Sequence, residues 1–284
     1  MNKREVLTQL QKDYFAKGTW SREDLLPYSN RRDSTFGQFV ANKELIELES
    51  FVHTLAGESA VTICDGRAVE ASYLKSNGLV VTATDLYPDY LRKAFEKGDI
   101  DNFSEENAEN LSYKTEEFDW GVVKAGLHHL PRPVIGIYEL LRVSKKGALI
   151  LEGHDGYFLR VLRKYLFRHR DWEPSGNYVY RFRRRELAKL CLALDIPAYA
   201  VKTSFLPWSR KHEDIKKNEL GYSARILFYR FINCIFSSQG NNFTAVIFKI
   251  VPTKNQIKSL KKNGFRYVKL PRNPYLKCSK LNSK

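Results

Sequence analysis

Short apolar runs alternate with amphipathic segments along the middle of the chain. Four runs have the length and β-branched content of buried strands: residues 60–64, 79–84, 118–125 and 148–152. Three segments between them space their apolar side chains as helices do: residues 67–77, 88–97 and 131–143. This alternation with short turns is typical of a parallel sheet covered by helices on both faces. The pattern therefore predicts an α/β, doubly wound fold with a mostly parallel sheet.

The flanking regions have weaker patterns. Two helices are predicted before the sheet, with apolar faces of Val6, Leu10, Tyr14 and Phe15 in the first and Leu45, Leu48, Phe51, Val52 and Leu55 in the second. Residues 29–35 between them are predicted to be a loop, and Lys146-Gly147 a turn. Residues 101–117 are acidic and loop-like, with Leu111 and Tyr113 marking a short strand. Beyond His154 the pattern predicts helices at 156–170, 183–194 and 220–236, and strands at 198–205 and 242–251.

These elements divide the chain into three parts. Residues 1–57 are predicted to be an N-terminal helical cap. Residues 58–252 form the α/β domain, with acceptor-binding insertions at 156–240, and residues 253–284 form a basic C-terminal tail. Apolar side chains such as Phe265 are too many for a fully solvated tail, so we expect it to dock in part on the domain.

Basic residues outnumber acidic ones and are unevenly placed. The 284 residues contain 47 Lys and Arg against 32 Asp and Glu, which gives a formal charge of +15. Residues 251–284 hold ten basic residues and no acidic one, and a second basic cluster runs from Arg160 to Arg185. Such fields attract nucleic acid, an anionic membrane surface or a phosphorylated substrate. A solvated basic face without a dedicated partner is an equally open alternative.

The cysteines and the first residues exclude several classes of protein. The four cysteines lie far apart, without a Cys-x-x-Cys pair or a histidine at ligand spacing, so we expect neither a metal site nor a disulfide framework. The charged start of the chain lacks the apolar core of a signal peptide. No apolar stretch approaches the roughly 20 residues of a membrane span. We therefore expect a cytoplasmic protein.

Candidate chemistry lies at the ends of the first two predicted strands. Asp65 and Gly66 follow the first strand, and Asp85 ends the second, 19 residues after Gly66. Open parallel sheets bind ligands beyond the carboxyl ends of their strands. A carboxylate at this distance suits hydrogen bonds from ribose hydroxyls, and a glycine lets the backbone approach a ligand closely. Only one of the three glycines of a dinucleotide fingerprint is present, so an ordinary strand-to-helix turn stays open.

Five segments in a fixed order favour the ligand-binding interpretation. They are residues 107–111 (NAENL), 118–123 (FDWGVV), 127–131 (LHHLP), 140–143 (LLRV) and 146–152 (KGALILE). With these segments, residues 58–155 resemble the class I S-adenosylmethionine-dependent methyltransferases, in particular the methyltransferase-11-like small-molecule branch. The resemblance implies a Rossmann-like fold, S-adenosyl-L-methionine as cofactor and the transfer of a methyl group.

The resemblance also implies cofactor-binding residues. Gly66 matches the turn beside the methionine part, Asp85 matches the ribose-binding acid, and Leu86 should pack on the adenine ring. Asn107 and Ala108 match the positions that address the adenine amino edge, where the family usually has Asp instead of Asn. The matching positions at the end of the fourth strand, which contact the methionine end through the backbone, are Lys124 and Ala125.

The first turn departs from the family pattern. Ala68 and Glu70 stand where the resemblance leads us to expect glycines. Asp65 and Arg67 are the alternative partners for the methionine carboxylate or amine. This departure leaves open a non-catalytic relative that has lost the cofactor.

The acceptor side offers three candidate catalytic residues. A hydroxyl acceptor must lose its proton, and histidine suits this task because its ordinary pKa lies near neutrality. His154 and Asp155 follow the fifth strand, and His128 lies beside His129 after the fourth. A packed, hydrogen-bonded role stays open for each. The predicted function is O-methylation of a small polar or sugar-containing acceptor.

Two further segments concern the acceptor. Residues 172–182 are dense in aromatic and amide side chains, which suits a phosphorylated or glycosidic molecule, and they resemble in a general way bacterial methyltransferases of surface-polysaccharide biosynthesis. Helix 220–236 is apolar around most of its circumference, which fits a buried cap, a dimer helix or contact with an anionic membrane that carries a lipid-linked acceptor. Nucleic-acid methylation is the less favoured alternative, because no Asn/Asp-Pro-Pro-Tyr/Phe element follows the fourth strand.

Overall fold

A large mixed sheet forms the centre of the protein. A computed structural model describes residues 3–17, 35–157, 160–161, 165, 171–206 and 215–278. Within these residues eight strands pair in the order β3-β2-β1-β4-β5-β7-β6-β8. The strands are β1 (Ser59–Ile63), β2 (Val80–Asp85), β3 (Asn102–Glu105), β4 (Phe118–Lys124), β5 (Ser144–Gly153), β6 (Ala198–Ser204), β7 (Asn242–Phe248) and β8 (Arg266–Lys269). The strands from β3 to β5 are parallel, whereas β7, β6 and β8 continue the sheet in antiparallel pairs.

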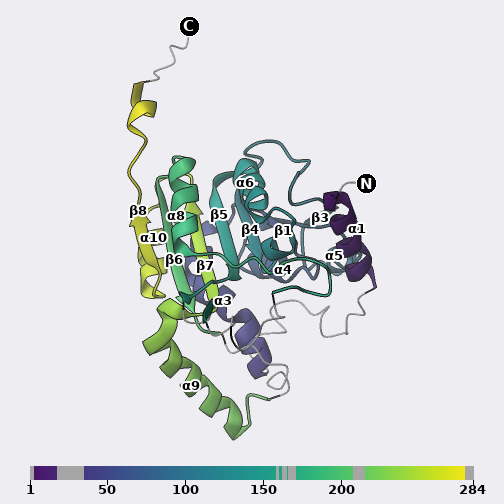
Figure 1. Cartoon of the computed structure of the whole chain (residues 1–284), viewed down its shortest axis with the longest axis vertical. Coiled ribbons are helices and arrows are strands. Elements are labelled where there is room, and N and C mark those ends of the chain that lie inside the picture. The colour runs from purple at the N-terminus through teal and green to yellow at the C-terminus, as the bar shows by residue number, and fades with distance from the viewer. Residues whose placement is uncertain are drawn as a thin grey trace.

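Helices cover both faces of this sheet (Figure 1). They are α1 (Lys3–Ala16), α3 (Phe36–Val52), α4 (Val69–Ser76), α5 (Asp89–Glu96), α6 (Pro133–Val143), α8 (Arg184–Ala193), α9 (Leu220–Phe236) and α10 (Lys254–Lys262). Residues of α3, α4 and α10 share one buried cluster with the sheet, and those of α6 and α8 share another. Successive residues of a strand enter opposite clusters, as Ala60 and Val61 of β1 do. The doubly wound α/β fold predicted from the sequence is thus confirmed.

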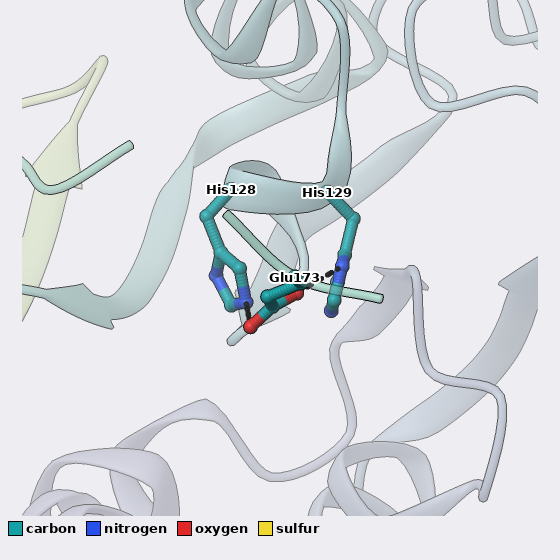
Figure 2. Close-up of side chains that lie close together, drawn as sticks. All are labelled: His128, His129 and Glu173. Atoms are coloured by element: carbon teal, nitrogen blue, oxygen red, sulfur yellow. Dashed lines mark ion pairs between the residues drawn. The ribbon is translucent and has the colours of Figure 1, made fainter. Parts of the chain in front are cut away.

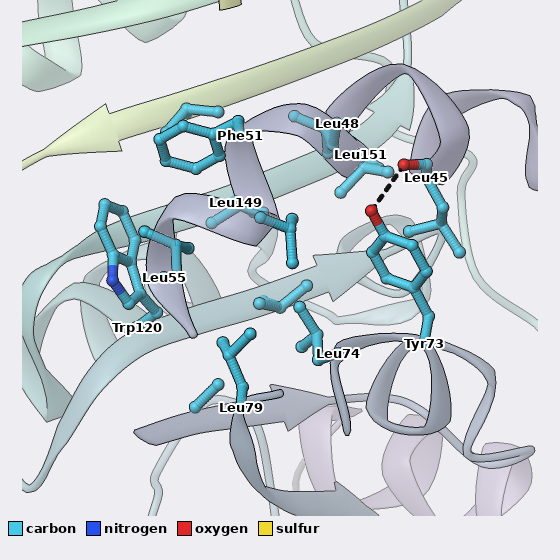
Figure 3. Close-up of a cluster of buried hydrophobic side chains, with 14 of the residues drawn as sticks. Leu45, Leu48, Phe51, Leu55, Tyr73, Leu74, Leu79, Trp120, Leu149 and Leu151 are labelled. Carbon is cyan, nitrogen blue, oxygen red and sulfur yellow. Dashed lines mark hydrogen bonds between the residues drawn. The ribbon is translucent and has the colours of Figure 1, made fainter. Parts of the chain in front are cut away.

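Aromatic rings join α3 to the middle of the sheet (Figure 3). Phe51 of α3 meets Trp120 of β4 edge to face, with 5.7 Å between ring centroids, and lies 5.9 Å from Phe248 of β7. The Tyr73 hydroxyl of α4 donates a hydrogen bond to the Leu45 carbonyl of α3 at 2.7 Å. These contacts make α3 an integral layer of the domain rather than part of a separate cap.

Two predicted features within the α/β region are wrong. The short strand lies at β3, upstream of Leu111 and Tyr113, which belong to a loop. Lys146 and Gly147 lie within β5 instead of forming a turn, because α6 continues directly into this strand. A Cβ on Gly147 would lie only 2.0 Å from the Ile247 carbonyl oxygen, so the glycine lets β5 approach β7 closely.

The basic region after residue 252 is largely part of the domain. Thr253 begins α10 with a capping box that it forms with Gln256. Leu260 and Phe265 are buried in the same cluster as α3 and α4. Strand β8 pairs with β6 at the edge of the sheet. Residues 254–269 are therefore a helix and an edge strand rather than a solvated extension.

Two predicted segments lie mostly outside the described residues, namely the loop at 29–35 and the helix at 156–170. In the part of the chain that the structure describes, no helix has the length and apolarity needed to cross a membrane.

Helix α1 presents an unexpected face to the domain. Val6 and Leu10 of its predicted apolar face are 42% and 52% exposed, whereas Gln11 is only 2% exposed. The inward position of a polar side chain implies that it meets polar groups of the domain.

Candidate active site

Polar side chains gather where the parallel strands end. The chain leaves β1 for β2 and β3 on one side and returns to β4 and β5 on the other, so the strand order reverses between β1 and β4. Open α/β sheets bind ligands at such a reversal, beyond the carboxyl ends of the strands. The structure places every site residue predicted from the sequence at or just after the carboxyl end of one of these five strands.

Asp65 anchors the turn after β1. Its Oδ2 accepts hydrogen bonds from Thr62 Oγ1 at 3.0 Å and from the Ala71 N–H at 2.8 Å, which fixes the start of α4. Asp65 is 3% exposed, and its Oδ1 has no hydrogen-bond partner within the described residues. Burial, followed by the neighbouring Glu70 carboxylate, raises the pKa of Asp65. Such a buried acceptor suits a donor supplied by a ligand.

Gly66 brings this turn close to the end of β2. A Cβ on Gly66 would lie 3.2 Å from Asp85 Oδ2, so a larger residue would press on that carboxylate. Cys64, Ala68 and Ala125 around the same strand ends have left-handed backbones with φ of 55°, 55° and 51°. This conformation costs about 1–2 kcal/mol per non-glycine residue, and such strain clusters at functional sites.

Asp85 ends β2 with a half-buried carboxylate. Its Oδ1 accepts the Tyr87 N–H at 3.0 Å. Burial raises the pKa of Asp85 to about 6, while backbone N–H groups and the nearby His129 limit the rise. Leu86 beside it is also half-buried. The Asp85 backbone carbonyl accepts the Glu106 N–H at 3.0 Å, which joins this strand end to the loop after β3.

The loop after β3 holds Asn107 and Ala108 in fixed positions. Asn107 Oδ1 accepts the Glu109 N–H at 2.9 Å, and the Asn107 carbonyl accepts the Asn110 N–H at 2.8 Å. Ala108 is buried and packs in the cluster that α6 covers. This turn therefore engages the Asn107 side-chain oxygen locally.

Lys124 ends β4 among buried carboxylates. Its Nζ lies 3.3 Å from Glu70 Oε1 of α4. Burial lowers the pKa of Lys124, but Glu70 and Glu44 together raise it more, so the net shift is upward. Glu44 of α3 accepts a hydrogen bond from Thr244 Oγ1 at 3.0 Å, and burial raises its pKa to about 7. The Lys124 ammonium is thus tied to the helical layer that α3 and α4 form.

A buried carboxylate orients His128. After β4 the chain forms the short 3-10 helix η3 (Leu127–His129). His128 Nδ1 lies 2.9 Å from Glu152 Oε2 at the end of β5, and Glu152 Oε1 accepts the Leu127 N–H at 2.6 Å. Burial lowers the pKa of His128, but Glu152 raises it more, so the net shift is upward. The contact with Glu152 favours a proton on Nδ1 and leaves Nε2 to face the site.

A turn from a later part of the chain covers the two histidines (Figure 2). Glu173 Oε2 lies 3.2 Å from His129 Nδ1, and Glu173 Oε1 lies 3.8 Å from His128 Nε2. The hydrogen bond with His129 is the main cause that lowers the pKa of Glu173 to about 2. The two imidazole centroids are 4.2 Å apart. Two imidazoles and one carboxylate therefore converge beyond the end of β4.

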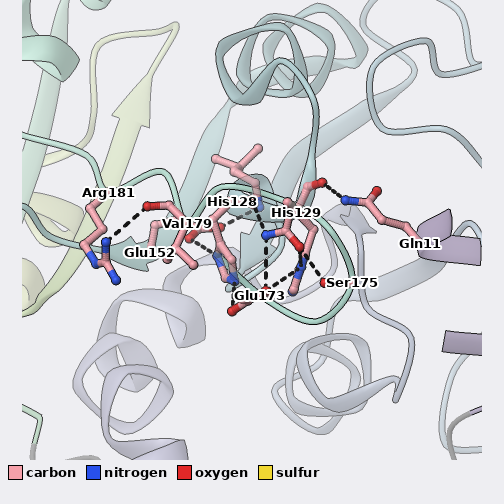
Figure 4. A network of polar contacts seen from close by, with 10 residues as sticks. Gln11, His128, His129, Glu152, Glu173, Ser175, Val179 and Arg181 are labelled. Carbon is pink, nitrogen blue, oxygen red and sulfur yellow. Dashed lines mark hydrogen bonds and ion pairs between the residues drawn. The ribbon is translucent and has the colours of Figure 1, made fainter. Parts of the chain in front are cut away.

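Buried polar groups hold this turn in place (Figure 4). Asn177 is 1% exposed, and its Nδ2 donates to the His128 carbonyl at 2.9 Å and to Glu173 Oε2 at 3.1 Å. The Ser175 hydroxyl donates to Asn177 Oδ1. On the other side, Gln11 of α1 donates to the carbonyl of His129, which explains why this polar side chain faces inward. Helix α1 and the 173–177 turn thus meet at η3.

His154 and Asp155 follow β5 but make different contacts. His154 is 5% exposed, with Nδ1 2.8 Å from the Gly240 carbonyl oxygen and its ring stacked near Phe243. Asp155 accepts a hydrogen bond from Arg183 Nε at 2.8 Å. The structure does not bring this predicted pair into the group formed by His128, His129 and Glu173.

The sequence indicated residues 172–182 as an acceptor-binding segment, but it did not assign individual roles to Glu173 and Asn177 within it, or to Glu152. Glu152 ends the fifth strand, and its role follows only from the pairing of β5 with β4. Asn177 lies 49 residues after the His128 whose carbonyl it binds. Besides the aromatic and amide content of residues 172–182, Pro174-Ser175-Gly176 indicates a turn but not what the turn covers.

Comparison with known proteins identifies the domain that carries these strand ends. A family model described as a methyltransferase domain matches residues 63–151, from the end of β1 to the later part of β5. The chain contains a methyltransferase domain. No curated protein sequence matches the chain.

Solved structures share the fold around this methyltransferase domain. A SAM-dependent methyltransferase from Thermotoga maritima has a TM-score of 0.50 at 15% identity, over 87% of this chain and 99% of that one. A 1,6-didemethyltoxoflavin-N1-methyltransferase from Burkholderia thailandensis, with S-adenosylhomocysteine bound, has a TM-score of 0.51 at 14% identity, over 88% and 92%. Magnesium protoporphyrin IX methyltransferase from Synechocystis, also with S-adenosylhomocysteine bound, has a TM-score of 0.50 at 12% identity, over 86% and 95%. At these identities the likeness is one of fold.

The family match and the fold together confirm the resemblance to class I S-adenosylmethionine-dependent methyltransferases. Together they support an S-adenosylmethionine-dependent methyltransferase, with S-adenosylmethionine as the methyl donor.

Proposed function

We propose that this methyltransferase acts on a hydroxyl oxygen of a small polar acceptor of the sugar type. The observation that carries the proposal is the convergence of His128, His129 and Glu173 beyond the end of β4. A hydroxyl group must lose its proton as its oxygen attacks, whereas an amine that is already deprotonated needs only alignment. Imidazole and carboxylate groups at the acceptor side therefore favour an oxygen nucleophile.

The residues at the strand ends suit the cofactor. When bound, S-adenosylmethionine supplies a methyl group on a sulfonium sulfur. We assign the unpartnered Asp65 Oδ1 of the described chain to the methionine amine, and the Asp85 carboxylate to the ribose hydroxyls. Gly66 keeps the turn after β1 close to Asp85. The other assigned positions are Leu86, Asn107 and Ala108 for the adenine ring, and Lys124 and Ala125 for the methionine end.

On the acceptor side we assign different roles to the predicted catalytic residues. His128 presents Nε2 to the site because Glu152 holds Nδ1. His154 and Asp155 engage the Gly240 carbonyl and Arg183, so we assign them to holding the loop after β5. The aromatic segment that carries Glu173, with Tyr178 49% exposed, is assigned to binding the acceptor ring by stacking.

Two histidine variants test these roles. We expect His128→Ala to reduce methyl transfer by about 10²–10⁴-fold, the usual scale for loss of a group that handles a proton. The matched variant His154→Ala should retain most of the activity, and both should bind S-adenosylhomocysteine in calorimetry. A loss confined to His154→Ala would move the role to the loop after β5.

A panel of acceptors tests the choice of oxygen. Radiolabelled S-adenosylmethionine would be offered with hydroxylated sugars, sugar phosphates and matched amino sugars. Methylation of hydroxyl groups supports the proposal. Methylation of the amino sugars at nitrogen alone contradicts it.

We further infer that the acceptor is presented at an anionic membrane surface. Tyr222 and Tyr229 of α9 pack against Phe36 and Val40 at the start of α3. The opposite face of α9, which stands out from the lower edge of the domain in Figure 1, exposes Leu220, Leu227, Phe228, Phe231 and Ile235, each more than half exposed. An apolar helix face on a chain of charge +15 is suited to the headgroup region of an anionic bilayer, which could carry a lipid-linked acceptor.

A further inference from the structure

The space between His128, His129 and Glu173 has the dimensions of a metal site (Figure 2). One ligand atom from each side chain lies within 4.8 Å of the other two. The Glu173 oxygens lie 3.2 Å from His129 Nδ1 and 3.8 Å from His128 Nε2. Two ligands about 2.1 Å from a tetrahedral zinc ion lie about 3.4 Å apart. We propose that these three side chains bind a divalent transition-metal ion, with Zn²⁺ as the preferred ion.

The environment of His128 is that of a metal ligand. A histidine that binds a metal nearly always donates its other ring N–H to a carboxylate or a carbonyl, which fixes the ring and keeps a lone pair on the ligand nitrogen. The buried Glu152 is this carboxylate for His128, because its Oε2 lies 2.9 Å from His128 Nδ1. Glu152 alone supplies the negative charge that would pair with a protonated His128. An ion pair therefore does not explain why a second carboxylate, that of Glu173, lies near Nε2 of the same ring. The lone pair of Nε2 is thereby directed to the space beside Glu173.

Glu173 is also held more firmly than a surface ion pair requires. The Asn177 amide, itself buried, binds both Glu173 Oε2 and the His128 carbonyl. The 173–177 turn is closed by the Glu173 N–H on the Asn177 carbonyl at 3.0 Å. Ligand positions that are fixed by supporting hydrogen bonds are what a preorganised metal site needs.

Within the described residues the site offers three protein ligands, two imidazoles and one carboxylate. This set, with the fourth position left for an oxygen ligand, is that of catalytic zinc sites. The inference rests on the proposed function in one respect, because we place the acceptor hydroxyl at that fourth position. With the ion bound, His128 would act as a ligand and would not itself accept the proton. The cation would lower the pKa of the hydroxyl, and the proton would pass to solvent. The oxygen keeps the electron pair that forms the bond to the methyl carbon, while the carbon–sulfur pair stays on sulfur.

The ion can be tested on the full chain without an acceptor. Metal-free protein would be titrated with ZnCl₂ by calorimetry and with CoCl₂ by visible absorption, which reports a coordinated cobalt ion. We expect one ion per chain, with a cobalt spectrum of a low-coordinate site. His129→Ala and Glu173→Gln should lose both signals. The control His53→Ala removes an exposed histidine away from the site and should keep them.

A positioning variant separates a metal site from an ion pair. Glu152→Gln leaves all three ligands in place, and we expect it to weaken Zn²⁺ binding by about 10–100-fold, the usual effect of losing a hydrogen-bonding partner of a metal ligand. Unchanged Zn²⁺ affinity in Glu173→Gln would overturn the site. Absence of zinc and cobalt binding in a wild-type protein that binds S-adenosylhomocysteine would overturn the ion while leaving the proposed function intact. Absence of S-adenosylhomocysteine binding itself would count against the proposed function.

Discussion

The Asp85 carboxylate is half-buried, and this burial raises its pKa to about 6 because the charged form loses contact with water. Ribose hydroxyls would offset that burial by donating hydrogen bonds to the carboxylate. We expect Asp85→Asn to weaken the binding of S-adenosylhomocysteine by about 1.5–3 kcal/mol, the range for hydrogen bonds to a charged group. Isothermal calorimetry measures the loss. The control Asp195→Asn changes an aspartate that pairs with Arg272 and should bind normally; equal affinities in the two variants would remove Asp85 from the ribose site.

Glu44 couples the stability of the domain to pH. Burial raises its pKa from 4.5 to about 7, and Lys124 and the hydrogen bonds from Asn242 and Thr244 only partly oppose this. Between these two values the folded chain keeps a proton that the unfolded chain releases, so the contribution of Glu44 to stability falls as pH rises. At about 1.4 kcal/mol per pKa unit, the shift corresponds to a few kcal/mol.

The variant Glu44→Gln removes this titration while keeping a similar shape. We expect the melting temperature of Glu44→Gln minus that of the wild type to increase as the pH is raised from about 5 to about 8. Scanning calorimetry across this window measures the difference. Glu96→Gln, an exposed change at the end of α5, should show no such trend. Parallel curves for Glu44→Gln and wild type would contradict the assignment.

The sequence predicted the position of some site residues but not of others. Asp65, Gly66 and Asp85 could be predicted as a group because each follows or ends an apolar strand, and parallel strands bring their carboxyl ends to one edge. Glu173 could not, because its turn reaches η3 through contacts between side chains and backbone that no sequence period records.

At the scale of elements, the sequence predicted a helix or strand correctly where one or both faces of that element are buried. The helix at Leu220–Phe236 has the predicted bounds, and β1 and β4 form where continuous apolar runs fill the centre of the sheet. Strand β3 was missed because it is a four-residue edge strand whose residues are exposed or half-buried, so burial imposes no period on them.

The exposed face of α9 predicts membrane binding. The pair Phe228→Asp and Phe231→Asp places two charges on that face, and we expect it to abolish sedimentation with vesicles that contain phosphatidylserine. Both side chains are about 60% exposed, so folding should be unaffected. Ser223→Asp adds a charge at an exposed polar position of the same helix and should still bind. A change of oligomeric state on gel filtration, without vesicle binding by the wild type, would instead make this face a contact between two copies.

At the scale of the whole molecule, α10 and β8 complete the sheet and its helical cover. Strand β8 covers the edge of β6, and Leu260, Phe265 and Leu270 are nearly fully buried. Burial of one such side chain contributes about 1.5–3 kcal/mol. We therefore expect deletion of residues 253–284 to lower the melting temperature by many degrees or to prevent folding. Deletion of residues 274–284 is the control and should leave the melting temperature and S-adenosylhomocysteine binding unchanged; equal stability of both products would show that α10 and β8 are dispensable.

The position of Trp172 gives the protein an optical reporter at its site. Trp172 is 66% exposed, directly precedes Glu173 and meets Tyr178 edge to face at 5.5 Å, whereas Trp120 is 1% exposed in the core. Indole fluorescence depends on the polarity and the quenching groups around the ring. With Trp20 and Trp208 replaced by phenylalanine, the blue-shifted emission of Trp120 would follow unfolding, and the red-shifted emission of Trp172 would follow events at the turn above the histidines. Ligands could then be screened by fluorescence without an added dye.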